Sequence, residues 1–245
     1  MYSEFAAVYD ALMCDANYAE RSKYLLSLFQ KYDRKPTLLL DLACGTGGFS
    51  NEFSKEGVQV IGVDISPEML TVAREVSMDL GQDVLYLCQN ATELDLYGTV
   101  DGAICCLDSL NHITDYEDFK AAIGKVSLFL EPQRLFIFDV NTLYKHEFVL
   151  GNNTIVKETD EVYCVWQNEY NDSTHTTDIN LDFFICEDGV YYRSEEHFCE
   201  RAYAHTEISE ACSEAGLEIV AVFDEMTENP PDSKTERAVY ITRKR

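Results

Sequence analysis

The first half of the chain alternates short apolar runs with amphipathic stretches. The runs TLLLDLA, VQVIGVDI, VLYLCQNA, VDGAICCLDSL and RLFIFDVN, all within residues 37–141, have the length of strands and few polar interruptions. Between them, residues 47–56 and 116–130 have helical periodicity, and a third helix is predicted to begin at Ser66, a good N-cap followed by Pro67. Strands alternating with helices predict parallel βαβ units with helices on both faces of one sheet.

The pattern changes after Asn141. EVYCVWQNEY, TTDINLDFFICE and VYYRSEEHFCERAY are longer and alternate in polarity, and NDST and EDG between them are typical of turns. They predict a three-stranded antiparallel meander over roughly residues 152–203. The first style then returns with a helix (HTEISEACSEAG) and two strands (LEIVAVFD and AVYITRKR).

These patterns predict one α/β domain with an insertion. We expect a Rossmann-like, doubly wound seven-stranded sheet formed by residues 36–145 and 204–245. Residues 146–203 form an inserted antiparallel β-meander cap, and residues 1–35 form a helical N-terminal cover.

Charge and cysteine content narrow the function. The net charge of −25, from 44 acidic and 19 basic residues, argues against nucleic acid, whose binding depends on Lys and Arg. The nine cysteines are odd in number and contain no C-x-x-C, which fits neither a disulfide framework nor a zinc site. We expect no metal, no membrane span, no signal peptide, and reduced thiols in the cytoplasm.

The stretch LLLDLACGTGGFS, residues 38–50, ends the first predicted strand with a glycine-rich turn. Ala43, Gly45 and Gly47 leave the turn without bulk, so that a ligand can approach the backbone and the free N–H groups of the next helix. Asp64 ends the second predicted strand, where a carboxylate can bind ribose hydroxyls. A dinucleotide would require G-x-G-x-x-G, but Ser50 occupies the third position, so that fingerprint is incomplete.

Four segments in order, over roughly residues 38–113, resemble the motifs of class I S-adenosylmethionine-dependent methyltransferases. D-x-A-C-G-T-G-G resembles motif I, and GVDISPEML, QNATEL and DGAICCLDSLNHI resemble the next three. The family usually has Asp where this chain has Asn90. The resemblance implies S-adenosylmethionine as cofactor, with contacts from Tyr9, Asp41, Ala43, Cys44, Gly45, Thr46, Gly47, Asp64, Ile65, Met69, Asn90, Ala91, Leu107 and Asp108.

Individual roles follow from the same resemblance. The small residues of the turn would pack against the methionine part and Asp64 would hold the ribose. Ile65 and Met69 would sandwich the adenine, whose edge would meet Asn90 and Ala91.

The predicted cap is similar to the added sheet of small-molecule N-methyltransferases, namely glycine N-methyltransferase and amino-sugar N,N-dimethyltransferases. FAAVYDALM is similar to their N-terminal cover, which implies a role for Tyr9 over the cofactor and in catalysis. The resemblance favours a small amine as methyl acceptor.

His112, just past the fourth predicted strand, is our candidate base, with a loop histidine of no role as the alternative. Candidate substrate residues are Asp108, Asn111, Trp166, His197, Arg201 and Arg237. Alternatives remain for three of them. Trp166 could instead be a core residue, and the face of the last meander strand that carries His197 could instead be exposed to solvent. Arg237 could instead form a surface ion pair with Glu236 or a nearby acid.

The residues leave other functions open. These are methylation of a protein or RNA, methylation of oxygen, and cofactor binding without catalysis. A nicotinamide-dependent oxidoreductase also stays open, though the incomplete glycine fingerprint argues against it. The sequence does not decide between a monomer and a dimer.

Overall fold

The computed structural model of the protein describes residues 16–159, 162–187 and 189–245. Tyr9 and the first 15 residues of the predicted N-terminal cover lie outside the described residues. None of the described helices is both long and apolar enough to span a bilayer.

The core is a seven-stranded sheet with the strand order β10-β11-β5-β4-β1-β2-β3. Its strands are β1 (Leu38–Leu42), β2 (Gln59–Asp64), β3 (Val84–Cys88), β4 (Gly102–Cys105), β5 (Leu135–Asn141), β10 (Leu217–Asp224) and β11 (Arg237–Lys244). Strands β1 to β5 pair in parallel, whereas β11 runs antiparallel to both β5 and β10. The Rossmann-like fold predicted from the alternation of apolar runs is confirmed.

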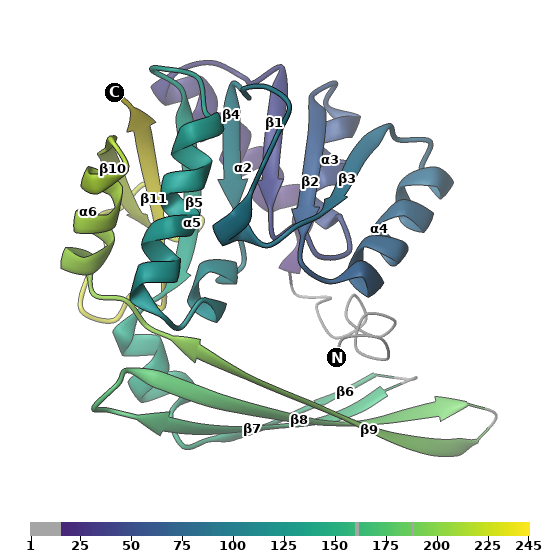
Figure 1. The fold of residues 1–245 in the computed structure, drawn as a ribbon. Helices are drawn as coiled ribbons and strands as arrows, with labels where there is room; N and C mark the ends of the chain where they lie inside the picture. The colour runs from purple at the N-terminus through teal and green to yellow at the C-terminus, as the bar shows by residue number, and fades with distance from the viewer. Residues whose placement is uncertain (1–15, 160–161, 188) are drawn as a thin grey trace.

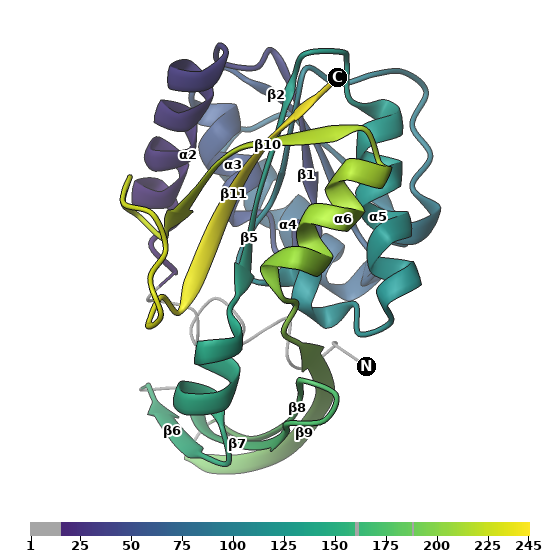
Figure 2. The ribbon, with the colours of Figure 1, turned by 90° about the vertical axis from the view of Figure 1, so that its left-hand side faces the viewer.

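Helices cover both faces of this sheet. They are α2 (Tyr18–Tyr32), α3 (Gly48–Lys55), α4 (Pro67–Asp79), α5 (Tyr116–Phe129) and α6 (His205–Glu214), with short 3-10 turns η2 (Ala91–Glu93) and η3 (Ser109–His112). Figure 2 shows α2 and α3 on one side of the sheet and α5 and α6 on the other. Each pair shields its own apolar cluster, and this explains why the parallel strands are apolar on both faces.

Local capping fixes the start of helix α4 next to the glycine-rich turn. The Ser66 hydroxyl accepts a hydrogen bond from the Met69 N–H at 3.1 Å, and Pro67 occupies the first turn, as predicted. The cap therefore holds the segment after β2 against the carboxyl end of that strand.

Between β5 and α6 the chain forms a separate antiparallel sheet with the order β6-β7-β8-β9. It follows η4 (Lys145–Leu150), a turn of π-helix, and its strands are β6 (Thr154–Glu158), β7 (Val162–Asn171), β8 (Thr176–Glu187) and β9 (Val190–Arg201). The prediction of three strands was wrong because β6 is short, is paired on one side only, and has a weak apolar pattern. We call this sheet, with η4, the cap; it lies beyond the carboxyl ends of β1, β2 and β4 (Figure 1).

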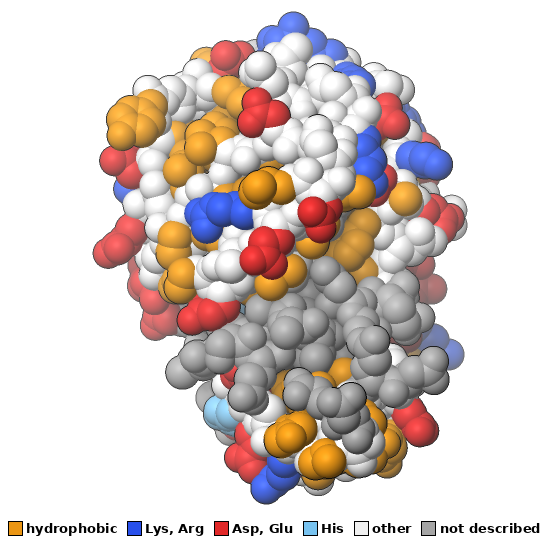
Figure 3. Space-filling view, turned by 90° about the vertical axis from the view of Figure 1, so that its right-hand side faces the viewer, with side chains coloured by type: hydrophobic (Ala, Val, Ile, Leu, Met, Phe, Trp, Pro, Cys, Tyr) orange, Lys and Arg blue, Asp and Glu red, His pale blue; other side chains and the backbone are white. Residues whose placement is uncertain are grey.

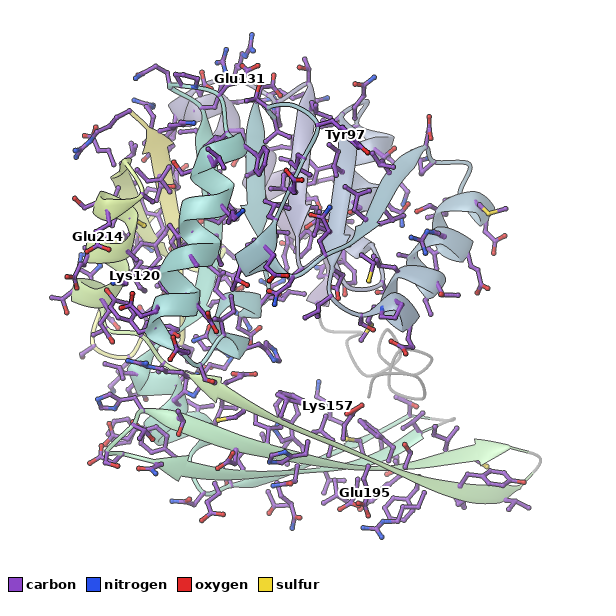
Figure 4. All side chains as sticks on the ribbon, in the orientation of Figure 1. Tyr97, Lys120, Glu131, Lys157, Glu195 and Glu214 are labelled. Atoms are coloured by element: carbon purple, nitrogen blue, oxygen red, sulfur yellow. The ribbon has the colours of Figure 1, made fainter. Side chains whose placement is uncertain are left out.

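The two faces of the cap sheet differ. Its small apolar cluster, which includes Ile179 and Phe183, shares a face with Phe198. Figure 4 shows Lys157 on the side of the sheet that faces the core and Glu195 on the opposite side. Acidic side chains are spread over the face of the molecule in Figure 3, in keeping with the net charge of −25.

Candidate active site

A cavity of about 320 Å³ opens at the carboxyl ends of β1, β2 and β4. This edge of a parallel sheet is where ligands bind in open α/β folds. Seven of the predicted cofactor residues line it, and these are Ala43, Gly45, Asp64, Ile65, Met69, Asn90 and Ala91. The glycine-rich turn, the end of β2 and the segment after β3 therefore converge as the motif order predicts.

The first two glycines of the turn serve different purposes. A Cβ on Gly45 would meet no described atom within 4 Å, and Gly45 lines the cavity, so its missing side chain leaves room for a ligand. A Cβ on Gly47 would instead press on Tyr86, 3.1 Å from its Cζ, and lie 3.3 Å from Ala73 Cβ. Gly47 does not line the cavity; it lets the turn pack against the Tyr86 ring.

Asp64 is held by the backbone on both sides. Its Oδ2 accepts a hydrogen bond from the Gly45 N–H at 2.8 Å, and its Oδ1 accepts one from the Ser66 N–H at 2.9 Å. Burial raises the pKa of this carboxyl, and the two backbone hydrogen bonds oppose that rise. Each oxygen keeps a further acceptor site for a ligand at the cavity wall.

Apolar and polar residues share the part of the cavity wall that follows β2 and β3. Ile65 is 61% exposed while Met69 is buried, and both line the cavity. The Asn90 side chain caps η2, since its Oδ1 accepts a hydrogen bond from the Thr92 N–H at 3.0 Å. Asn90 thus has a local structural role beside any contact with a ligand.

Three predicted cofactor residues lie beneath the turn instead of on the cavity wall. Asp41 is 1% exposed and accepts a hydrogen bond from the Ser50 hydroxyl at 2.6 Å. Burial raises the pKa of Asp41 to about 7 and also raises that of the Cys44 thiol. Thr46 is buried as well. Ser50 is the residue that departs from the dinucleotide fingerprint, and here it anchors Asp41.

A strained turn follows β4. Leu107 and Asp108 are consecutive non-glycine residues with φ near +55°, a conformation that persists only where the surroundings enforce it. The Asp139 carboxylate does so by accepting hydrogen bonds from the Leu107 N–H at 2.9 Å and the Asp108 N–H at 2.7 Å. Arg237 then bridges the Asp108 and Asp139 carboxylates at 2.9 and 2.7 Å.

Arg237 is therefore committed to an internal ion network. Its Nε also lies 3.1 Å from Glu225, and its side chain is only 10% exposed. The sequence suggested Glu236 or a nearby acid as the ion-pair partner of Arg237. The acids that Arg237 contacts are Asp108, Asp139 and Glu225, and the network is buried instead of lying at the surface. The Arg237 guanidinium, with Lys145 and His112, holds the pKa of Asp108 well below its usual range despite burial.

His112 lines the cavity on its cap side. Its ring contacts that of Phe198 on β9, with centroids 4.9 Å apart and the planes tilted by 36°, and its Nε2 lies 3.6 Å from Glu200 Oε1. Burial lowers the pKa of His112, whereas the charges of Asp108 and Asp64 oppose that effect. The candidate base thus lies where the core and the cap meet.

The other predicted substrate residues are scattered. Trp166 pairs with Leu181 on the core-facing side of the cap, and its Nε1–H donates to Asn168. Asn111 is fully buried and bonds backbone groups of Asn141 and Arg201, so it ties the cap to the core instead of reaching the cavity.

Two charged candidates point elsewhere. His197 is 61% exposed and lies near Asp178 on the outer side of the cap, which is the solvated face left open by the sequence. Arg201 donates to Glu207 and to the Thr114 carbonyl and stacks on the Tyr203 ring. The structure does not bring either side chain to the cavity.

Sequence reasoning missed Asp139, His146 and Glu200. Asp139 lies two residues before the end of β5 in RLFIFDVN, close to the strand-end position that flagged Asp64 on β2, so a similar signal was available. Glu200 and His146 carry no local signal, because only the packing of the cap decides which face of β9, and which side chain of η4, turns toward the core.

S-adenosylmethionine fits the described residues. Gly45 leaves open space at the turn, Asp64 offers two fixed acceptors for a diol, and Ile65 and Met69 offer apolar surface for a base. These features match the chemistry of a methionine chain, a ribose and an adenine in the same order.

Comparisons with known proteins agree with this geometry. A family model described as a methyltransferase domain matches residues 39–133. The chain is 28% identical over 245 residues to YqeM of Bacillus subtilis (strain 168), which carries the provisional name of a methyltransferase, and covers 97% of it. Among solved structures, the sugar N-methyltransferase KedS8 from Streptoalloteichus sp ATCC 53650 has a TM-score of 0.79 at 16% identity, with 97% of this chain and 93% of KedS8 covered, and so shares the fold.

A stronger match is the crystal structure of an S-adenosylmethionine-dependent methyltransferase from Clostridium acetobutylicum ATCC 824. It is 32% identical to this chain with a TM-score of 0.91, and the match covers 99% of this chain and 98% of that one. The expected cofactor and enzyme class are thereby confirmed, and the chain belongs to the S-adenosylmethionine-dependent methyltransferases.

Proposed function

We propose that this enzyme methylates the nitrogen of a small-molecule amine. The observation that carries the proposal is the position of His112, which lines the cofactor cavity and packs against Phe198 of the cap. Residues 146–203 then roof the acceptor site, whereas the described part of residues 1–35 packs as α2 on one face of the sheet. The sugar N-methyltransferase with the same fold supports a nitrogen acceptor.

Within this proposal the cofactor residues keep the roles of their motifs. Asp64 holds the ribose hydroxyls, Gly45 admits the methionine chain, and Ile65 and Met69 enclose the adenine. S-adenosylmethionine supplies a methyl group activated by a sulfonium. The chain aligns this methyl group with the acceptor and excludes water, and such alignment contributes about 7–11 kcal/mol to catalysis.

An amine at neutral pH carries a proton that must leave before its lone pair can attack. His112 suits this task because burial lowers its pKa, so that its imidazole is neutral and can accept a proton. The ionised Asp108 carboxylate nearby favours the approach of a cationic amine.

The experiment is transfer of tritium from methyl-labelled S-adenosylmethionine to a panel of acceptors, namely D-glucosamine, methylamine, catechol and a lysine-rich peptide. We expect label in a small amine, and a rate that falls about 100-fold in His112→Gln, the low end for loss of a general base. His197→Gln on the outer side of the cap is the matched control and should keep the wild-type rate. Label confined to catechol or to the peptide, or an unimpaired His112→Gln enzyme, would contradict the proposal.

A further inference from the structure

A carboxyl group is buried between two histidines where the cap meets the core. The Glu200 side chain, at the end of β9, is 5% exposed. Its Oε1 lies 3.6 Å from His112 Nε2, and its Oε2 lies 3.7 Å from His146 Nε2. The three residues come from η3 of the core, from η4, and from the last cap strand, so the cluster exists only when the cap is docked.

One ring nitrogen of His146 has a hydrogen-bond partner among the described residues and the other has none. Its Nδ1 lies 2.8 Å from the Thr177 hydroxyl on β8. Its Nε2 is buried with no hydrogen-bond partner among the described residues. An orphaned buried polar atom costs about 1–3 kcal/mol. Glu200 Oε2 faces this nitrogen 3.7 Å away, so a small shift of either side chain would complete the bond.

The ring of His112 is fixed on two sides. The tilted Phe198 ring packs against it, and Glu200 lies at the Nε2 edge. With Nε2 directed at a carboxyl group, Nδ1 is the ring nitrogen left for the acceptor in the cavity. A histidine base whose second nitrogen faces a carboxylate has the arrangement that orients such bases and stabilises their protonated form.

We propose that Glu200 is a positioning residue for methyl transfer, in that it orients His112 and stabilises the imidazolium ion that forms there, while His146 holds Glu200. The proton moves from the acceptor ammonium to His112 Nδ1. The freed lone pair then forms the N–CH₃ bond as the S–CH₃ bond breaks, and the electron pair of that bond stays on sulfur. The amine acceptor in this inference rests on the proposed function. The placement of Glu200 beside His112 and His146 is independent of that function.

Charged, titratable and polar groups from several elements surround Glu200. Those that act on it are Asp108 and His112 at η3, Asn141 on β5, Lys145 and His146 on η4, and Arg237 on β11. Burial and the charge of Asp108 raise the pKa of Glu200 to about 8, although the Asn141 amide and the two cations oppose the rise. Burial lowers the pKa of His146 to about 4, so His146 is neutral at pH 7. Glu200 therefore exchanges a proton near neutral pH, close to the working range of the base beside it.

The test is a titration of the histidine ring nitrogens by NMR in the full chain saturated with S-adenosylhomocysteine. The chain has only five histidines, and His112→Gln assigns the signal of interest. In the wild-type protein we expect the chemical shifts of the His112 ring nitrogens to change in a step near pH 8, when the Glu200–His112 pair takes up its first proton. In Glu200→Gln that step should disappear, and His112 should titrate once, below its ordinary pKa, because burial remains and the carboxylate is gone.

Two further variants sharpen the result. Glu195→Gln lies on the same strand but on the outer side, and it should leave the His112 curve unchanged. His146→Phe removes the ring nitrogens beside Glu200, so the step should move to higher pH. A wild-type His112 ring without a step near pH 8 would overturn the proposal, as would superimposable curves for wild type and a folded Glu200→Gln.

Kinetics complete the test with the most reactive amine of the panel above. We expect Glu200→Gln to lower kcat about 100-fold and to leave the KM for S-adenosylmethionine unchanged. An equal rate would overturn the positioning role. The titration needs no acceptor, so failure of the amine screen would remove the proposed function and leave the His112–Glu200 pairing to be judged alone.

Discussion

The two glycines of the turn, Gly45 and Gly47, should fail in opposite ways when each is replaced by alanine. Both have positive φ, +53° and +80°, where a side chain costs about 1–2 kcal/mol. At Gly47 the new Cβ also presses on the Tyr86 ring, and overpacking of this kind adds about 1–3 kcal/mol. We therefore expect Gly47→Ala to lose about 2–5 kcal/mol of unfolding free energy, or about 4–20 °C in Tm.

Gly45→Ala should lose only the backbone part, because its Cβ meets no described atom within 4 Å. That Cβ instead projects into the cavity where the cofactor is proposed to lie. The affinity of the Gly45→Ala protein for S-adenosylhomocysteine should fall at least about 10-fold, equivalent to about 1.4 kcal/mol. Gly47→Ala, measured well below its Tm, should bind almost as tightly as wild type.

Urea unfolding and calorimetric titration of the same samples measure both quantities. A cycle with Tyr86→Phe tests the cause, since removing the tyrosine hydroxyl should reduce the loss in Gly47→Ala. The reasoning is refuted if Gly47→Ala is as stable as wild type, or if Gly45→Ala keeps wild-type affinity.

Three other outcomes can be measured with single variants. Asp64→Ala should remove the two charge-assisted hydrogen bonds that we propose to the ribose, at about 1.5–3 kcal/mol each, so calorimetry should show affinity for S-adenosylhomocysteine reduced about 100-fold or more; a loss under threefold contradicts the assignment. Asp41 has a pKa raised to about 7 by burial, so the unfolded chain ionises first and wild-type stability falls as pH rises from about 4 to 7. In Asp41→Asn urea unfolding should lack this component, with a relative gain at pH 7.5 of up to about 4 kcal/mol; a difference between variant and wild type that is independent of pH would count against it. Trp166→Ala should raise the KM for the acceptor while His197→Ala leaves it unchanged in the same rate assay; the reverse order would place the substrate on the wrong side of the cap.

The helices and strands of the core were predictable because their signals are local. A buried parallel strand is apolar along its whole length, and a helix start such as Ser66-Pro67 requires particular residues at fixed offsets. The glycine-rich turn and Asp64 belong to the same class of signal, because both act within a few residues of a strand end. The short edge strand Thr154–Glu158 escaped prediction since five residues paired on one side give little pattern.

The substrate side of the site was much less predictable. A strand of alternating polarity has two faces, and its period does not say which of them points inward. On β9 the exposed set contains His197, whereas the set that faces the core contains Phe198 and Glu200.

The sequence by itself determined the α/β core, the inserted sheet, and the cofactor end of the cavity, all of which depend on short-range periodicity and on motifs at strand ends. Tertiary structure alone decided that Arg237 pairs with Asp108, 129 positions away, and that Glu200 lies beside His112. The physical reason is burial. The pairing of a charged side chain and its pKa depend on which distant groups share its low-dielectric surroundings, and no local pattern carries that information.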